Sequence, residues 1–414
     1  MFKKAWLIAR AVGSIGSVIG YLISRSAWMR MRRIRHRFSS ASSSHAGHEL
    51  RNIVVIGASM AGYHAAKTIA ESLLPGSPYR VVGHEHKAFI PYGPYLRRIP
   101  EDALRWVRGR AVGITRDSVR LGSGEEIPYE FLIVATGAGA TDALPSRVDS
   151  DDLSEGISQL KNMQSRIKEA KNVVVVGGGA AGVELATDAK SQYPEKTVVL
   201  VHSRDSVMHR FGPGLQKAAM EGLKDLGVEI ITGDRLIGED KERSVVTLRS
   251  GKEVECDFLV NCAGQRPNST LLAELSPNSV TATGHARAKP TMQIDDESLP
   301  NVYVCGDVAE TSTPNPNSRS ARAQAQVAAD NVVLAIDGRK PTREYRPNWL
   351  EALIKLTLGL DKSVTHIGDF SGTEMLFPAK EKDLALMSGG AWKHMGATPF
   401  QDDTESLQRF FNKA

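Results

Sequence analysis

Cysteine is scarce in this sequence, with three residues among 414. Cys256, Cys262 and Cys305 each lie in an apolar run typical of a buried strand, and none has a partner at the spacing of a metal-binding pair. The eleven histidines likewise form no HExxH-like pair. We therefore expect structural thiols and no metal site.

Acidic residues are missing from the first 48 positions, and the first carboxylate is Glu49. The same stretch contains nine basic residues: Lys3, Lys4, Arg10, Arg25, Arg30, Arg32, Arg33, Arg35 and Arg37. Without these nine charges the formal net charge falls from +5 to −4. Because the rest of the chain then lacks the basic footprint that phosphate binding needs, we expect no nucleic-acid partner.

The leader, residues 1–48, is Arg-rich, contains serine and is partly apolar, which is typical of a mitochondrial transit peptide. Its uncharged run AVGSIGSVIGYLIS has 14 residues, short of the roughly 20 that span a bilayer. Extension back to Ala5 makes a span possible, with Gly16 and Gly20 forming a GxxxG face. A cleavable leader or a segment lying on anionic lipid fits as well. We predict a mitochondrial, membrane-associated protein.

The stretch VVIGASMAG (54–62) is similar to a dinucleotide-binding turn between a strand and a helix. Gly57 fits the tight turn and Gly62 the close helix–strand packing, while Ser59 stands where a second glycine lets backbone approach phosphate. Glu85, which lies 23 residues after Gly62, fits the carboxylate that binds a ribose. The predicted nucleotide contacts in the turn are Gly57, Ala58, Ser59, Ala61 and Gly62.

The stretch VVVVGGGAAGVELA repeats the pattern without modification. Gly177, Gly179 and Gly182 stand at the fingerprint spacing, Ala181 precedes the third glycine, and a β-branched run again leads into an alanine-rich helix. Two such turns on one chain predict two nucleotide sites, one for each half of a redox relay.

Three further apolar runs follow the fingerprints and end in small-residue turns: YEFLIVATGA with Thr136 and Gly137, CDFLVNCAGQRPN with Gly264, and LPNVYVCGDVAE with Gly306 and Asp307. The Asp307 carboxylate can accept hydrogen bonds from a polyol chain, and Gly306 lets backbone approach a phosphate.

The order of these five motifs resembles the two-dinucleotide-binding-domain flavoproteins over about residues 50 to 345. The resemblance implies an α/β fold with two Rossmann-like domains and a small C-terminal α+β cap. It also implies that the first fingerprint and the CGD turn hold FAD, while the second fingerprint holds NADH or NADPH. The expected organisation is a leader over 1–48, FAD-binding parts over 49–150 and 290–345, an NAD(P)H-binding domain over 151–289 and a C-terminal domain over 346–414.

The segments VVVVGGGAAGVELATDAKSQYPEKTVVLVHSRDSV, YRPNWLEALIKLTLG and KDLALMSGGAWKHMGATP are similar to the apoptosis-inducing-factor-like flavoproteins. They most resemble the ferroptosis-suppressor-type NAD(P)H:quinone reductase branch of the pyridine nucleotide-disulfide oxidoreductase superfamily. The chain departs from that branch at Ser59-Met60 and in its leader. Disulfide reductases of the superfamily carry a dithiol after the first ribose-binding acid, but HEHKAFIPYGPYLRRIP contains no cysteine. The resemblance therefore implies an FAD-dependent enzyme that passes electrons directly to a ubiquinone-like quinone or another small acceptor.

The resemblance also implies roles for single residues. It places Glu184 beside the nicotinamide and flavin, where the carboxylate would orient the carboxamide, and a first-turn acid that complements the helix dipole is the alternative. Arg97 matches a flavin or quinone contact, with a solvated arginine as the alternative. The run ARAQAQVAAD resembles the quinone-side helix of type II NADH dehydrogenases, except that Asp330 replaces a second glutamine. A redox-gated signalling protein and a ferredoxin- or rubredoxin-type reductase stay open as other functions.

Coenzyme choice is predicted from the run KTVVLVHSRDS. His202 lies 20 residues after Gly182, where an NAD-selective site carries a carboxylate on the ribose 2′-hydroxyl. Arg204 offers a fork-shaped, charged partner for a 2′-phosphate, unless it pairs with Asp205 at the surface. We expect NADPH to be accepted at least as well as NADH.

Overall fold

The computed structural model divides the chain into two compact units, each assembled from separate stretches of sequence. Unit 1 comprises Met1–Ala11, Ala140–Gln265 and Ala352–Met387, and unit 2 comprises Val12–Gly139, Arg266–Glu351 and Ser388–Ala414. The structure describes residues 2–39, 51–57, 59–74, 79–84, 93–140, 153–368, 373–382 and 388–399. The domain boundaries expected from the sequence remain predictions.

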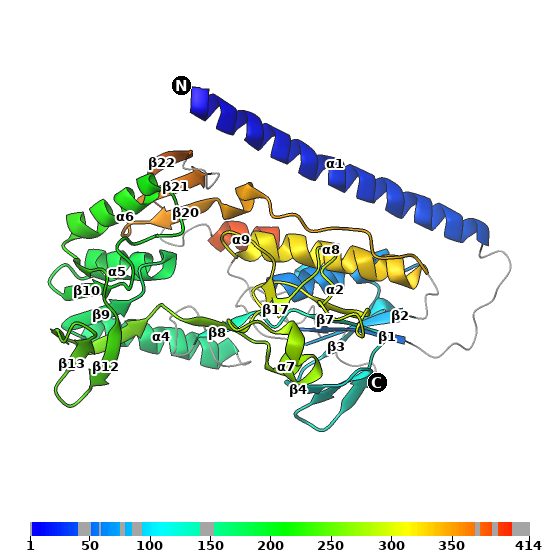
Figure 1. Ribbon diagram of the computed structural model, residues 1–414, viewed down its shortest axis with the longest axis horizontal. Helices are drawn as coiled ribbons and strands as arrows, with labels where there is room; N and C mark the ends of the chain where they lie inside the picture. The colour runs from blue at the N-terminus through cyan, green and yellow to red at the C-terminus, as the bar shows by residue number, and fades with distance from the viewer. Residues whose placement is uncertain are drawn as a thin grey trace. The chain divides into compact units, whose positions relative to one another are not determined.

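A five-stranded parallel sheet forms the centre of unit 2 (Figure 1). Its strands, in spatial order, are β18 (Val302–Val304), β7 (Phe131–Val134), β1 (Arg51–Ile56), β2 (Tyr79–His84) and β3 (Leu104–Val107). Strands β1 and β7 are buried on both faces, which explains why each is a continuous apolar run and not an alternating one. This sheet agrees with the α/β fold expected from the sequence.

Helix α2 (Met60–Ser72) packs on this sheet and on helix α8 (Ser318–Ile336). Most of the small residues of α2 are buried, which allows the close approach of the two helices. Helix α8 begins at a capping box, in which the Asn317 side chain accepts the Ser320 N–H and the Ser320 hydroxyl accepts the Asn317 N–H. The capping box fixes the start of α8.

Smaller elements complete unit 2. They are the antiparallel strands β4 (Ala111–Ile114), β5 (Ser118–Leu121) and β6 (Glu126–Pro128), the pair β17 (Ala286–Arg287) and β19 (Ala309–Glu310), helices α3 (Gly93–Leu96), α7 (Thr270–Leu275) and α9 (Ser388–His394), and the 3₁₀ helices η2 (Glu101–Ala103) and η3 (Pro277–Ser279). Where the chain passes between the units, β8 (Ala138–Ala140) pairs with β16 (Gln265–Pro267), and η4 (Trp349–Ala352) lies at the next passage.

Unit 1 contains a second parallel sheet, in the order β11-β10-β9-β15. Its strands and helices are β11 (Glu229–Ile231), β10 (Thr197–Val201), β9 (Asn172–Val176), β15 (Phe258–Asn261), α4 (Leu153–Glu169), α5 (Ala180–Gln192) and α6 (Pro213–Leu226). An antiparallel sheet of β12 (Leu236–Asp240), β13 (Val245–Leu248) and β14 (Glu253–Glu255) is attached to it. Unit 1 therefore repeats the strand–turn–helix arrangement of unit 2.

The last part of unit 1 is an antiparallel sheet of β20 (Ile354–Thr357), β21 (Lys362–Gly368) and β22 (Glu374–Lys380). Leu356 and Val364 belong to the same buried cluster as Leu215 and Leu223 of α6. The Glu374 carboxylate accepts the Gly214 N–H at 2.5 Å and thereby satisfies a free amide at the start of α6. This sheet is thus part of the core of unit 1.

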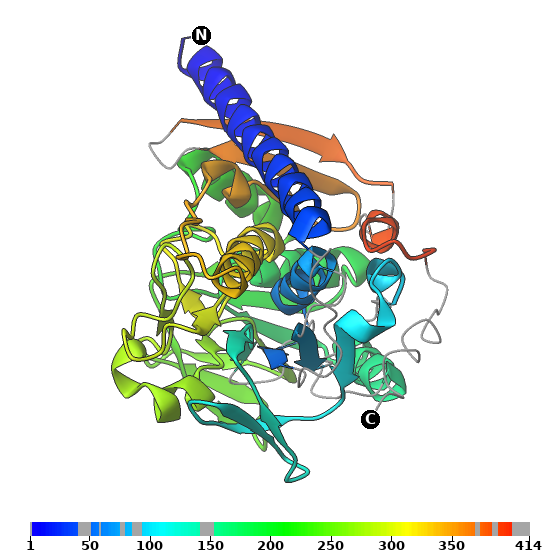
Figure 2. The same cartoon turned by 90° about the vertical axis from the view of Figure 1, so that its right-hand side faces the viewer.

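Helix α1 (Phe2–Ser39) is the longest helix of the described chain (Figure 2). From Val12 onward it belongs to unit 2, where its Ser14 hydroxyl accepts the Trp349 Nε1–H at 3.1 Å. The stretch Ala5–Arg35 is long and apolar enough to cross a membrane by length and composition. The structure therefore contains a helical anchor candidate that also contacts the folded body.

Candidate nucleotide-binding sites

The first glycine turn follows β1 and leads into α2. Gly57 has φ +97°, and a Cβ atom on it would lie 2.3 Å from the Ala135 carbonyl oxygen. A Cβ atom on Gly62 would lie 1.7 Å from the Gly57 carbonyl oxygen. Both positions therefore exclude any side chain, as the fingerprint requires.

Ser59 is the residue before α2, with extended backbone angles and an exposed side chain. Its hydroxyl does not cap the helix, so the side chain leaves the first-turn N–H groups of α2 unblocked. Such N–H groups and the helix dipole together bind phosphate. The serine is therefore compatible with a phosphate at this turn. Ala58 and Glu85 lie outside the described residues.

The turn after β18 lies against the same helix. Gly306 has φ +78°, its N–H donates to Gln324 Oε1 at 2.8 Å, and a Cβ atom on it would lie 3.2 Å from the Ala61 Cβ atom. Asp307 is half-buried, and its carboxylate accepts no hydrogen bond from the described part of the chain. A half-buried carboxylate with free acceptor capacity fits the polyol chain of a flavin nucleotide.

The turn after β7 completes this site. Thr136 Oγ1 donates to the Asn268 carbonyl oxygen at 2.7 Å, and Asn268 Nδ2 donates back to the Thr136 carbonyl oxygen at 3.0 Å. Gly137 has φ +68° and open space where a side chain would stand. The carboxyl ends of β1, β7 and β18 are neighbours, so the three turns meet at one edge of the sheet, where nucleotides bind in such folds. Arg97 is exposed just after α3, and its predicted contact with flavin or quinone stays a prediction.

The second glycine turn, in unit 1, has the same geometry. Gly177 has φ +112°, and a Cβ atom on Gly182 would lie 1.8 Å from the Gly177 carbonyl oxygen. Gly179 precedes α5, is exposed, and has no protein atom within 4 Å of where its Cβ would lie. Ala181 is exposed in the first turn of α5. This open space at a helix N-terminus fits a dinucleotide pyrophosphate.

The His202 side chain is hydrogen-bonded to the backbone of this turn. Its Nδ1 accepts the Gly178 N–H at 3.0 Å, and its Nε2 lies 3.3 Å from His209 Nδ1. Burial lowers the pKa of His202, and the nearby His209 and Arg204 add to this effect. The ring is therefore neutral, with the proton on Nε2, and it holds the backbone of Gly178 in place.

Arg204 lies two residues further on and is exposed. Its guanidinium forms no ion pair with Asp205 or with any other described residue. The backbone is fixed, because the Arg204 carbonyl oxygen accepts the Gly233 N–H at 3.0 Å. The surface pair that was the alternative for Arg204 is not formed, and the charge is free to meet an anion. Gly264, just after β15, has φ +78°.

Glu184 and Asp188 lie one turn apart on α5. Glu184 Oε1 accepts the Thr357 N–H at 3.1 Å, and burial raises the pKa of Glu184. Burial, and secondly the Glu184 charge, raise the pKa of Asp188 to about 6. Asp188 Oδ1 is buried without a hydrogen-bond partner in the described chain. Sequence reasoning singled out Glu184 and missed Asp188, although the spacing of four residues was visible.

The three cysteines are free thiols: Cys256 and Cys305 are buried, and Cys262 is half-buried. Burial raises the pKa of Cys256 and of Cys262 to about 11 and that of Cys305 to about 12. They are thus protonated and poor nucleophiles near neutral pH. Within the described residues no group of histidine, cysteine or acidic side chains is arranged to hold a metal ion.

Comparisons with known proteins show the family to which the chain belongs. The sequence profile of the family described as "Pyridine nucleotide-disulphide oxidoreductase" matches residues 51–332. Fe-regulated protein 8 of Mycosarcoma maydis is 31% identical over 363 residues, which cover 76% of this chain and 88% of the relative. Ferroptosis suppressor protein 1 of Homo sapiens is 30% identical over 329 residues, which cover 77% and 84%.

Solved structures are similar to this chain in fold. A ferredoxin reductase for the CYP199A2 system from Rhodopseudomonas palustris has a TM-score of 0.59 at 22% identity, covering 78% of this chain and 83% of that one. A NAD-dependent persulfide reductase from A. fulgidus has a TM-score of 0.59 at 21% identity, covering 78% and 65%. At these sequence identities the similarity shows the fold but does not identify the substrate.

Proposed function

Because this chain belongs to the pyridine nucleotide-disulphide oxidoreductase family, we propose that it is an NAD(P)H:quinone oxidoreductase that uses FAD. The observation that carries the choice of acceptor is the absence of a cysteine pair after the first fingerprint. The sequence has no cysteine between Ile56 and Asp240. Without a dithiol relay, electrons would leave the flavin directly for a quinone, oxygen or a redox protein. Of these we propose the quinone, because the chain resembles the ferroptosis-suppressor-type quinone reductases.

The turns after β1, β7 and β18 would hold FAD, and the turn after β9 would hold NADH or NADPH. When bound, FAD accepts a hydride from the coenzyme and gives two electrons to the quinone. Each turnover oxidises one NAD(P)H and reduces one quinone to its hydroquinone, with one further proton taken from solvent. Asp307 would orient the ribityl chain, while Glu85 would bind the adenosine ribose.

Glu184 would orient the nicotinamide. Its Oε1 accepts the Thr357 N–H, which fixes the carboxylate, and the carboxylate would also accept a hydrogen bond from the carboxamide. A fixed carboxylate of this kind restricts the rotation of the bound ring and so favours one face for hydride transfer. Arg97 would contact the flavin or the quinone.

The test is an anaerobic titration of the purified full-length protein. We expect a bound-FAD spectrum that NADH or NADPH bleaches and that short-chain ubiquinone restores. The matched control offers an oxidised ferredoxin-like protein in place of the quinone. Faster reoxidation by the protein acceptor, or a flavin that stays oxidised under excess coenzyme, contradicts the quinone reductase.

The leader would direct this enzyme to mitochondria and attach it to a membrane. Its composition supports this, since nine basic residues occur without a carboxylate before Glu49 and α1 includes an apolar stretch. Fusion of residues 1–48 to a soluble reporter should bring the reporter to mitochondria. A reporter that stays in the cytosol or collects on lipid droplets contradicts the mitochondrial location.

A further inference from the structure

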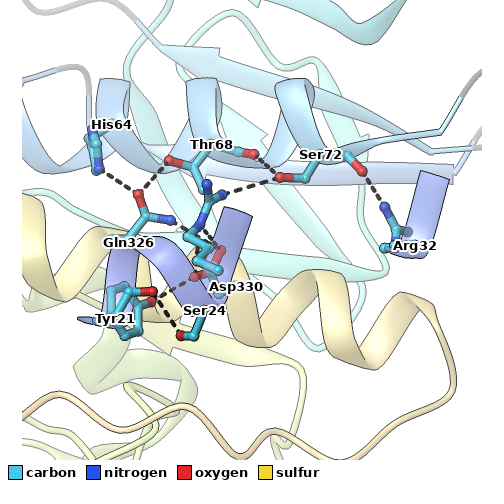
Figure 3. Close-up of polar contacts among 9 residues, drawn as sticks. Tyr21, Ser24, Arg32, His64, Thr68, Ser72, Gln326 and Asp330 are labelled. Carbon is cyan, nitrogen blue, oxygen red and sulfur yellow. Dashed lines mark hydrogen bonds and ion pairs between the residues drawn. The ribbon is translucent and has the colours of Figure 1, made fainter. Parts of the chain in front are cut away.

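A buried carboxylate on α8 is paired with α1. Asp330 has no exposed surface. The Tyr21 hydroxyl donates to Asp330 Oδ2 at 2.7 Å, and Arg25 Nε lies 2.9 Å from Oδ1 and 3.0 Å from Oδ2. Gln326 Nε2 also donates to Oδ1 at 3.1 Å, and its Oε1 lies 3.0 Å from His64 Nε2 (Figure 3). Gln326 thus connects the ion pair to His64 on α2 through hydrogen bonds.

A second ion pair lies two turns further along α1. Arg32 is almost completely buried, and its Nε and Nη2 each lie 2.6 Å from an oxygen of Asp337. Its Nη1 donates to the Ser72 carbonyl oxygen at the end of α2. Bidentate pairing of this kind fixes both position and orientation. We call the contacts of Arg25 with Asp330 and of Arg32 with Asp337 the α1 clamp.

Another side of α1 carries an apolar stripe that is exposed in the structure. It consists of Val12, Ile15, Ile19, Leu22 and Ile23, whose side chains are between 51% and 65% exposed. The three- and four-residue steps place these side chains on one helical face. Arg30 continues the same spacing and is also exposed, whereas Arg33 is exposed but donates through Nη2 to the Glu71 carbonyl oxygen at 3.3 Å. Beyond the apolar run, the stripe is thus continued by the exposed side chain of Arg30.

We propose that α1 stays attached to unit 2 and lies parallel to an anionic bilayer surface, with the apolar stripe in the membrane and the clamp facing the protein. An apolar face continued by a basic side chain fits the boundary between acyl chains and lipid phosphates. A helix that crossed the bilayer over residues 5–24 would have to give up the Ser14–Trp349 and Tyr21–Asp330 hydrogen bonds to unit 2. This orientation rests on the proposed membrane association and is independent of the electron acceptor.

The first test measures depth in the bilayer. Spin labels are placed at Val12, Ile15, Ile19 and Ile23 of the full-length protein, bound to vesicles of phosphatidylcholine and phosphatidylserine. We expect one shallow depth of about 5–10 Å for all four labels. A spanning helix would instead separate the first and last labels by about 16 Å, because it rises 1.5 Å per residue, and this result overturns the proposal.

The second test compares two substitutions that add the same charge. Ile19→Glu lies in the stripe, and Ser17→Glu is an exposed position outside it. We expect Ile19→Glu to weaken vesicle flotation about tenfold or more, because burial of one isoleucine contributes about that factor. Ser17→Glu should change flotation far less, and both variants should keep the flavin spectrum. Equal effects of the two substitutions on flotation overturn the proposal. So does the finding that the wild-type protein is a dimer without vesicles and that Ile19→Glu dissociates this dimer.

The two tests separate the possible failures. A wild-type chain that does not float with vesicles contradicts the membrane association on which the orientation rests. A chain that floats but gives the spanning depth profile contradicts only the orientation. A chain that floats, gives one depth and lacks quinone activity leaves the orientation supported and contradicts the proposed acceptor.

Discussion

At the scale of single residues, Arg204 is the side chain on which we expect coenzyme choice to depend. It is exposed and has no ion pair in the described chain, and a charge-assisted contact to a 2′-phosphate contributes about 1.5–3 kcal/mol. Arg204→Glu should therefore lower kcat/KM for NADPH by one to two orders of magnitude and leave NADH nearly unchanged. Arg210→Glu, at another exposed arginine, is the matched control. Equal loss with both coenzymes would remove Arg204 from the site.

Asp188 should make stability depend on pH. Its pKa is raised from 3.8 to about 6 by burial and then by Glu184. Between these values the folded protein keeps a proton that the unfolded chain has lost, so stability falls as pH rises through this window. Asp188→Asn should flatten that fall in the thermal midpoint measured from pH 4 to 7. Asp225→Asn, at an exposed aspartate of the same unit, should not, and an unchanged profile in Asp188→Asn would refute the assignment.

At the scale of elements, the α1 clamp should stabilise unit 2. Removal of one partner of a buried ion pair costs roughly 3 kcal/mol, which corresponds to a fall of about 6–12 °C in the melting midpoint. Arg25→Ala should produce this fall, measured by the release of flavin fluorescence, and Asp330→Asn in the same background should restore part of it. Arg30→Ala, at an exposed position of the same helix, is the control. No recovery in the double variant would contradict the pairing.

Elements with a local signal were predictable from the sequence. The strand–turn–helix segments of β1–α2 and β9–α5 follow from apolar runs and from glycines that only a tight turn requires. The pairing of Arg25 with Asp330 was not predictable, because about 300 residues separate the partners. The contact of His202 with the Gly178 N–H was also not predictable, because it depends on the folded backbone and not on a sequence pattern.

At the scale of the whole molecule, the two nucleotide sites belong to different units and should respond to substitution separately. Gly179→Ala adds a methyl group that meets no protein atom within 4 Å, so it should preserve the fold while it obstructs the pyrophosphate. We expect weaker coenzyme binding with full flavin content. Asp307→Ala should lower flavin affinity about 10- to 150-fold, with Glu310→Ala as its exposed neighbour control. Loss of flavin in Gly179→Ala would contradict the assignment of the two turns.

The interleaved order of the units also has a consequence for biogenesis. The core of unit 1 contains Leu356 and Val364, which lie in a sheet encoded after the second stretch of unit 2. During translation, more than 100 residues are synthesised after α6 before the sheet that covers the apolar faces of α5 and α6. Nascent chains of this length expose aggregation-prone surface. In a chain that stalls before Ala352, the glycine turn after β9 has already been synthesised, but the sheet that covers α5 and α6 is missing. We therefore expect such a chain to bind chaperones.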